Sequence, residues 1–240
     1  MKKILTTLFC TFLLINLCEA QEYEHYTWWS RVALQKKIND HWTVGGELHW
    51  RRQNDFQSSS ISPFALELTE GFKVLAIYKT KEFAFSFEPF FLNSHPLNAK
   101  EADLKRTDKL EIRPVVFAEW LKPLSKKLIF RSRLGYEYRI FKRTDGLWGD
   151  EQGRFRIRFQ LRYLLDKKNT VYISEEDLRN VVPNVPANVF SQNQLYFAYI
   201  HAFSPHFSTE IGYIWNHRQR ATLVEFDEEN ILQTIFMFRF

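Results

Sequence analysis

The sequence predicts an all-β fold, an antiparallel transmembrane β-barrel of about twelve strands with short periplasmic turns and longer extracellular loops. Three observations predict it. Apolar and polar residues alternate with a period of two through most of the chain, which places the two sets on opposite faces of strands. Short and longer connections follow each other in turn, as in barrels that cross a bilayer. The last segment carries apolar residues on one face and ends on Phe240.

Composition excludes several other classes of protein. The chain has 240 residues, of which 45% are apolar and 25% charged, so it is neither disordered nor collagen-like. Its formal charge of +5 is small and evenly spread, which does not indicate a nucleic-acid partner. After residue 20 no apolar run approaches the roughly 18 residues of a membrane-spanning helix. A multi-helix membrane protein is therefore excluded, whereas a membrane protein made of strands is not.

Residues 1–20 have the layout of a secretory signal peptide. A positive start precedes an apolar stretch over 4–17, and the small residues Cys18 and Ala20 then resemble a cleavage site. The alternatives are a short membrane anchor and a lipoprotein modified at Cys18. Both cysteines of the chain, Cys10 and Cys18, fall in this segment. The mature domain, residues 21–240, would therefore contain no thiol, disulfide or cysteine-based metal site, and we expect no cofactor.

Eleven strand-like segments make up this domain. The clearest runs from Arg154 to Tyr163, where a polar residue alternates with an apolar one at every step; a helix would scatter its arginines around the axis. The segments lie at 25–36, 42–52, 63–78, 83–92, 107–121, 127–141, 154–165, 170–180, 190–201, 207–218 and 230–240. Short connections lie near 37–41, 79–82, 122–126, 166–169 and 202–206, and longer ones near 53–62, 93–106, 142–153, 181–189 and 219–229.

The number of segments conflicts with a general rule. Bacterial single-chain barrels have an even number of strands, with both ends of the chain in the periplasm. We therefore expect a further strand, within 93–106, which gives twelve. If 25–36 is not a strand, the number is ten.

The residues on each face indicate which one meets lipid. The polar face is rich in arginine and glutamate, whereas lysines gather in the short connections. A closed barrel with its apolar face in lipid explains both, because closure satisfies every backbone hydrogen bond in hydrocarbon. We expect seven aromatic residues in the interfacial girdles: Trp28, Trp42, Trp50, Trp120, Tyr138, Tyr163 and Trp215.

The polar face then lines the lumen, where basic residues outnumber acids. Two interpretations follow: a salt-bridge lattice that fills and stiffens a narrow barrel, or an electropositive passage for small anionic solutes. Arginine suits both because its planar fork can bridge several carboxylates. The lumen-lining residues that we expect are Glu47, Arg51, Glu88, Glu111, Arg113, Arg131, Arg133, Glu137, Arg139, Arg154, Arg156, Arg158, Arg162 and Glu210.

Other functions have less support. His206, Ser208 and Glu210 share one face of a strand and could act as base, nucleophile and orienting residue of an outer-membrane lipid hydrolase. They lie at a short, periplasmic turn, far from the outer leaflet, so we expect no enzymatic activity. A soluble periplasmic barrel with an apolar, ligand-binding interior is a further alternative. Among the histidines, only His49 shares a strand face with a second possible metal ligand at suitable spacing, and that residue is Glu47. A hydrogen-bonded pair is the simpler interpretation of these two residues. We expect no metal site.

One loop differs from the others in composition. Residues 181–189 are apolar for an exposed segment, and Pro183 and Pro186 restrain them. We expect this loop either to fold over the lumen as a partial plug or to cap a neighbouring loop.

The last strand and several internal motifs resemble one known family. Leu232, Phe236, Phe238 and Phe240 share one face, like the terminal strand by which the barrel-assembly machinery recognises its substrates. Further motifs are Trp28-Trp29, Glu47-Leu48-His49-Trp50-Arg51, Gly135-Tyr136-Glu137-Tyr138-Arg139, Arg154 to Arg162, Ser174-Glu175-Glu176-Asp177, Ser191-Gln192-Asn193-Gln194 with Tyr196, and Gly212-Tyr213-Ile214-Trp215.

Together, in this order, they resemble the bacterial family of domain of unknown function 2490, over nearly the whole mature chain. Members often have Arg and Gly where this chain has Gln194 and Ala198. The resemblance implies a barrel in the outer membrane of a Gram-negative bacterium. We expect a monomer in contact with outer-membrane lipids and lipopolysaccharide. The resemblance implies no established activity.

Overall fold

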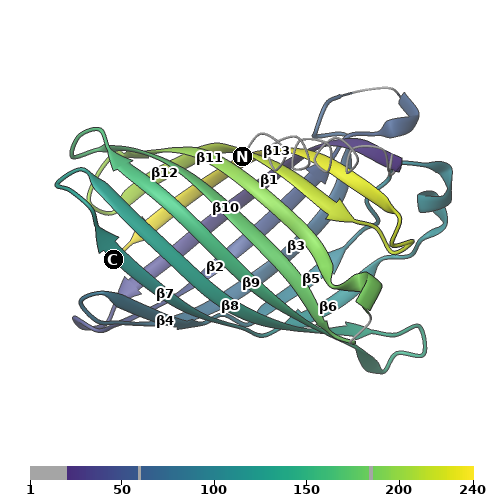
Figure 1. Cartoon of the computed structure of the whole chain (residues 1–240), viewed down its shortest axis with the longest axis horizontal. Helices are drawn as coiled ribbons and strands as arrows, with labels where there is room; N and C mark the ends of the chain where they lie inside the picture. Colours follow the sequence, from purple (N-terminus) through teal and green to yellow (C-terminus); the bar gives the residue numbers. More distant parts are fainter. Residues whose placement is uncertain (1–20, 59–60, 184–185) are drawn as a thin grey trace, which may run out of the picture.

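The computed structural model describes residues 21–58, 61–183 and 186–240, and the predicted signal peptide lies outside them. The described chain is a barrel of strands joined by short connections (Figure 1). The strands are β1 (Gln21–Lys37), β2 (Trp42–Gln53), β3 (Leu66–Lys79), β4 (Phe83–Phe87), β5 (Phe90–Ser94), β6 (Lys109–Arg113), β7 (Val115–Pro123), β8 (Leu128–Lys142), β9 (Trp148–Leu164), β10 (Asn169–Val182), β11 (Phe190–Ala202), β12 (Phe207–Gln219) and β13 (Glu225–Arg239). Three short 3₁₀ helices occur in loops: η1 (Phe56–Ser58), η2 (Glu101–Lys105) and η3 (Pro186–Asn188). Within the described ranges no helix is long and apolar enough to cross a membrane.

Two of the barrel strands are interrupted by prolines. β4 and β5 pair with consecutive stretches of β3, and Pro89 lies in the gap between them. β6 and β7 both pair with β8, and Pro114 separates them. Proline has no N–H to donate to the ladder, but the carbonyls of Pro89 and Pro114 still accept bonds from Val74 and Tyr138. The thirteen elements therefore form eleven strands.

These strands close into a ring by pairing β1 with β13 in parallel. The prediction of an all-β barrel of about twelve strands is confirmed, with eleven strands in place of the expected twelve or ten. With an odd number, the first and last strands run in the same direction, so they meet in parallel instead of antiparallel. Residues 93–106 hold no additional strand but carry η2, and 25–36 is a strand. As a result β1 begins at one end of the barrel and β13 finishes at the other.

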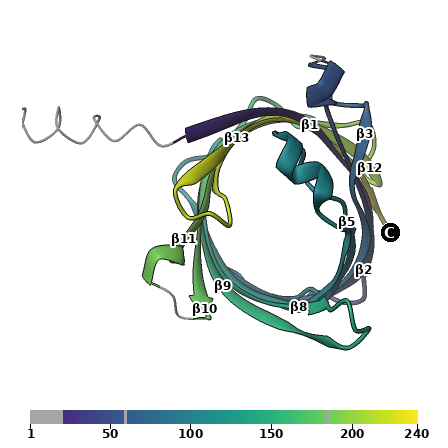
Figure 2. The ribbon, with the colours of Figure 1, turned by 90° about the vertical axis from the view of Figure 1, so that its right-hand side faces the viewer.

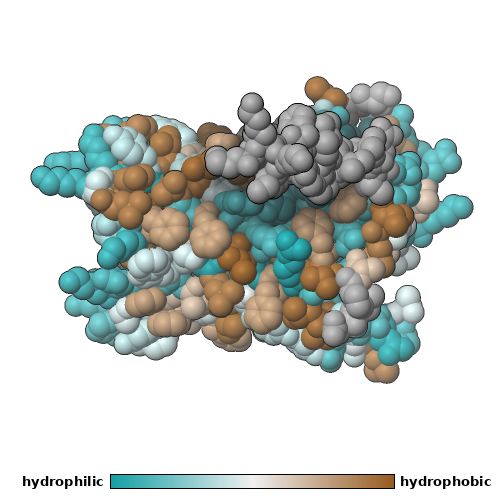
Figure 3. Space-filling model, in the orientation of Figure 1, coloured by the Kyte–Doolittle hydropathy of each residue, from teal (hydrophilic) through white to brown (hydrophobic). Residues whose placement is uncertain are grey.

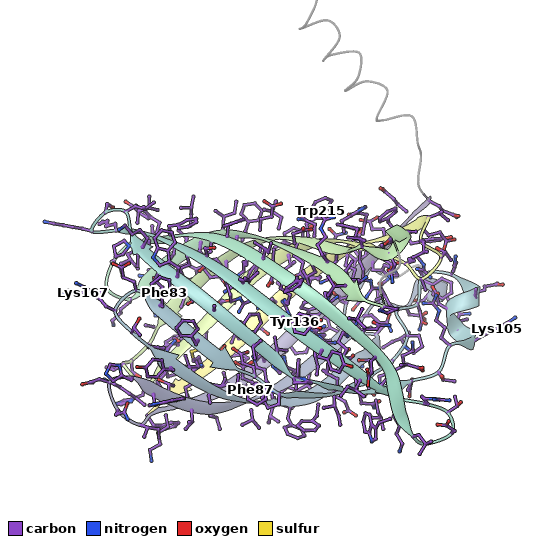
Figure 4. All side chains as sticks on the ribbon, turned by 60° about the horizontal axis from the view of Figure 1, so that its bottom comes forward. Phe83, Phe87, Lys105, Tyr136, Lys167 and Trp215 are labelled. Atoms are coloured by element: carbon purple, nitrogen blue, oxygen red, sulfur yellow. The ribbon has the colours of Figure 1, made fainter. Side chains whose placement is uncertain are left out.

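Short turns and longer loops lie at opposite ends of the barrel. The turns 38–41, 80–82, 124–127, 165–168 and 203–206 define what we call the turn end, and 54–65, 95–108, 143–147, 183–189 and 220–224 define the loop end. Two of the loops are shorter than expected because β9 and β13 begin earlier, at Trp148 and Glu225. The outer-face Phe83 lies toward the turn end, as does Lys167 in its turn, whereas Lys105 lies at the loop end (Figure 4).

The outer face of the barrel is apolar and the inner face is charged. Phe85, Leu134 and Phe159 are about half exposed, at 49%, 52% and 51%. Apolar side chains cover much of the surface between the two ends (Figure 3). Glu137 on the inner face is completely buried. This arrangement is the reverse of a soluble barrel, so the alternative of a soluble protein with an apolar interior does not fit.

The expected girdle residues all lie on the outer face. Trp42, Trp50, Trp120, Tyr163 and Trp215 are exposed, and Trp28 and Tyr138 are partly exposed. Trp215 projects outward from β12, and Tyr136 does so from β8 (Figure 4). A ring that is apolar in its body and polar at its tip suits the boundary between lipid and water.

Candidate functional site: the charged barrel lumen

A lattice of ion pairs occupies the lumen. Glu137 accepts hydrogen bonds from Arg154 Nε at 2.6 Å and from Arg156 Nη1 at 3.1 Å. Arg156 also binds Glu176 through two bonds of 2.9 and 3.0 Å, and Arg133 binds the same carboxylate at 3.1 Å. The carboxylates lie on β8 and β10, and β9 between them supplies Arg154 and Arg156. The alternation of β9 produces this, because it directs every second residue inward.

Two further carboxylates are centres of the lattice. Glu111 binds Arg113 and Arg139, with Nε to Oε1 distances of 2.5 and 2.8 Å. Glu119 binds Arg131 at 2.6 Å. Such charge-assisted bonds fix both partners, because a guanidinium can hold a carboxylate with two N–H groups.

Glu47 is the most highly connected acid on the wall formed by β1 to β3. It contacts Lys73 at 2.9 Å, His49 at 3.0 Å and Arg31 at 3.3 Å. Lys73 in turn binds Glu88 at 2.8 Å. The hydrogen bond between His49 and Glu47 agrees with their interpretation as a structural pair.

The structure directs all fourteen of the expected lumen residues into the barrel. Eleven of them are hydrogen-bonded to an oppositely charged partner, or in the case of Glu210 to two tyrosines, and Arg158 lies 3.7 Å from the nearest oxygen of Glu119. Arg51 and Arg162 have no carboxylate within 4.0 Å among the described residues. Both guanidinium groups lie over aromatic rings instead. The Arg51 guanidinium is 3.8 Å from the ring centre of Trp29, and the Arg162 guanidinium is 5.4 Å from the ring centre of Tyr172. These two side chains carry positive charge that the lattice does not neutralise.

Two cavities leave space inside the lattice. One of about 540 Å³ lies toward the turn end, and we call it the turn-end chamber. A second of about 380 Å³ lies in the middle of the lumen and includes Trp29, Arg51 and Arg113 in its wall. Arg131, Arg133, Arg158 and Arg162 line both, so the two cavities adjoin. The lumen is therefore charged and only partly filled.

The loop 95–108 narrows the lumen at the loop end. η2 lies within the ring of strands when the barrel is viewed along its axis (Figure 2). Asp103 is fully buried and binds Arg220 from the loop between β12 and β13. Lys100 binds Glu225, with an Nζ to Oε1 distance of 2.6 Å. We call these two ion pairs the latch, because they join the 95–108 loop to the wall made by β1, β12 and β13.

The expectation that residues 181–189 plug the lumen is wrong for the described part of that loop. η3 lies outside the ring of strands (Figure 2). Gln219 at the end of β12 donates a hydrogen bond to the carbonyl of Ala187 at 3.2 Å, so the loop caps its neighbour, which was the other expectation. The sequence did not reveal the latch, because Asp103 and Arg220 are 117 residues apart.

The latch should respond to acid only at low pH. Although burial opposes its charge, the Arg220 hydrogen bond and the Ala99 N–H hold the pKa of Asp103 below its ordinary value; Arg106 and the Lys100 N–H also face it. A lowered pKa stabilises the closed loop above the pKa of the free carboxyl, about 3.9. We therefore expect the opening at the loop end to keep the same width between about pH 5 and 8 and to widen below about pH 4. Channel conductance at each pH measures this, and it should be constant in the first range and higher in the second. A transition near neutral pH would contradict this assignment.

His206, Ser208 and Glu210 do not form a catalytic arrangement. His206 Nδ1 lies 2.8 Å from the carbonyl of Arg239, and Ser208 accepts a bond from the Arg239 guanidinium at 3.1 Å. Glu210 accepts the hydroxyls of Tyr172 and Tyr196, at 2.7 and 2.5 Å. Among the described residues none of the three is hydrogen-bonded to another, so the serine has no hydrogen-bonded base in this structure.

We expect replacement of Ser208 by Ala to leave membrane lipids unchanged, because this hydroxyl binds an arginine and not a base. Mass spectrometry of lipid A and phospholipids from cells with and without the protein measures this. A modified lipid that disappears with Ser208→Ala would contradict it.

One group of possible metal ligands was not expected from the sequence. Ligand atoms of Glu22, His217 and Glu228 lie within 4.8 Å of one another on the outer face near the loop end. They come from three adjacent strands, β1, β12 and β13, so no spacing in the sequence brings them together. Exposed acids commonly gather without an ion, and we assign no role to this group.

The four residues expected to signal assembly lie along β13 and directly after it. Leu232 and Phe236 are exposed on the outer face, and Phe238 is partly exposed. Phe240 is 67% exposed, and its backbone binds that of Gln35 and Lys37. All four are accessible on the outside of the barrel.

An apolar exterior, a charged interior and a closed ring of strands define a β-barrel of the kind whose apolar face is turned outward. The chain belongs to the family described as protein of unknown function DUF2490, which matches residues 27–226, and the family prediction is confirmed. Among solved structures, the chain is similar to the NanC porin in a rhombohedral crystal form, with 13% identity and a TM-score of 0.47, over 89% of this chain and 97% of the other. No curated protein matches the chain.

Proposed function

We propose that the mature chain is a monomeric barrel of the outer membrane in a Gram-negative bacterium, exported through residues 1–20. The apolar outer face supports a lipid environment, and ring closure removes the unpaired strand edges that hydrocarbon does not tolerate. The partners in this proposal are outer-membrane lipids and lipopolysaccharide, and the assembly machinery that reads the face of Leu232, Phe236, Phe238 and Phe240.

Cell fractionation tests the location. A barrel in the outer membrane should be recovered in that fraction and should change its gel mobility on heating, as closed barrels do when they unfold. Recovery in the soluble periplasmic fraction would overturn the proposal.

The function that the geometry supports best is a narrow, non-enzymatic passage for small anionic solutes. One observation carries it: the lumen contains two adjoining cavities, and their walls hold two guanidinium groups, those of Arg51 and Arg162, that have no carboxylate within 4.0 Å among the described residues. Such a field attracts anions and raises their local concentration. The latch narrows this passage at the loop end.

Conductance of the refolded barrel in a planar bilayer tests this function. We expect a small single-channel conductance and, in a salt gradient, a reversal potential displaced toward that of the anion. Absence of conductance, in this chain and in a chain without the latch, would end the pore proposal. It would favour the second candidate, a mainly structural barrel, which the extent of the ion-pair lattice supports.

A further inference from the structure

The turn-end chamber contains more positive groups than its own acids can neutralise. Five arginines and three glutamates contribute to its wall: Arg131, Arg133, Arg158, Arg162, Arg239, Glu88, Glu119 and Glu210. Glu88 is paired with Lys73 and Glu119 with Arg131. Glu210 accepts two neutral tyrosine hydroxyls and keeps its negative charge, with no arginine within 4.0 Å of it among the described residues. One carboxylate charge therefore remains for Arg158, Arg162 and Arg239 together.

Arg158 is the clearest case. Its Cα partner on β8 is Arg133, so two cations face each other directly across the strands. Like charges in that position destabilise a sheet. Its Cα partner on β10 is Glu176, but that carboxylate binds Arg156 and Arg133 instead. The nearest carboxylate oxygen to Arg158 is on Glu119, at 3.7 Å, beyond hydrogen-bonding distance.

Arg162 and Arg239 are less compensated still. Within the described part of the chain neither has a carboxylate within 4.0 Å. Arg162 follows Arg158 on the same face of β9, and Arg239 donates to Ser208 at 3.1 Å from β13, four strands further round the ring. Guanidinium groups therefore approach one chamber from two separate walls.

We propose that the turn-end chamber is a binding site for a small phosphate-type oxyanion carrying two or more negative charges, held by Arg158 and Arg162 on one wall and Arg239 on the other. Guanidinium N–H groups pair with phosphate oxygens two at a time. A single negative charge would leave part of the excess uncompensated, whereas a multivalent anion offsets both this excess and the repulsion between Arg133 and Arg158. The site deepens the proposed anion passage and depends on it for the access of solutes.

Titration calorimetry of the full-length mature barrel in detergent, with inorganic phosphate at constant ionic strength, tests the site. We expect saturable binding of phosphate, no saturable binding of chloride, and weaker binding of malonate, a dicarboxylate. The double variant R158Q/R162Q should bind phosphate at least about tenfold more weakly, because it removes two charge-assisted guanidinium contacts. R179Q is the matched control, since Arg179 is an exposed arginine on the outer face, bound to Asp177, and should bind phosphate like the parent.

Heat-modifiable gel mobility shows whether each variant folds, and R162Q alone provides a second variant that removes no ion pair. Equal phosphate binding by the parent, R162Q and the double variant would overturn the site, as would tighter binding of malonate than of phosphate. The binding measurement needs no membrane. If the barrel binds phosphate but does not conduct, the binding site stands and the pore proposal fails. If the barrel conducts anions but does not bind phosphate, the binding site is refuted and the pore proposal stands.

Discussion

Replacing Glu137 by Ala should lower the free energy of unfolding by about 3–5 kcal/mol, the usual cost of removing one partner from a buried ion pair. Glu137 is fully buried and binds Arg154 and Arg156, so its loss leaves Arg154 without a carboxylate and Arg156 with Glu176 alone. Denaturant unfolding of the refolded barrel, followed by gel mobility and tryptophan fluorescence, measures the change.

The outer face offers a matched control for this prediction. Asp177 and Arg179 form an ion pair at 2.6 Å, but their side chains are 29% and 48% exposed. Replacing Asp177 by Asn should therefore cost no more than about 1 kcal/mol. Equal stability of the Glu137 and Asp177 variants would show that water in the lumen screens the lattice as fully as it screens the surface.

Replacing Asp103 by Ala should open the loop end of the barrel. The substitution removes the carboxylate that joins η2 to Arg220 and leaves that guanidinium buried with Asp227 and Glu225 alone. A loss of about 3 kcal/mol from the closed state would raise the ratio of open to closed loops by about a hundredfold. Single-channel recording should show a larger conductance or a longer open time.

Glu101 provides the control for the latch. It lies in the same short helix and is exposed, so Glu101→Gln should leave conductance unchanged. The same conductance in the Asp103 variant and the parent, with both folded, would mean that the 95–108 loop does not limit passage.

The sequence predicted the faces of the strands better than their connections. The alternation from Arg154 to Arg162 determines which residues point inward, because a strand has only two faces, and all fourteen expected lumen residues lie inside. The partner of each arginine could not be predicted, because it depends on the register between strands. Glu176 illustrates this: it lies opposite Arg158 but binds Arg156 and Arg133.

The strand count and the latch required three-dimensional information. We expected a twelfth strand in 93–106 because bacterial barrels usually have an even number of strands. No local sequence pattern indicates that β1 and β13 pair in parallel to close the ring. Asp103 and Arg220 lie in different loops, and only the closed ring brings them together. The only sequence signal for the latch was the presence of charged residues in the longest loops. That signal does not specify which of these residues form ion pairs.

The odd number of crossings has a practical consequence. In a bilayer, a peptide fused ahead of β1 and another fused behind β13 would be displayed to different compartments. In a barrel with an even number of strands the two labels would share one side. Testing each label separately with a protease or an antibody on intact cells would thus show whether the number of strands is odd or even. It would also show which end of the barrel faces outward.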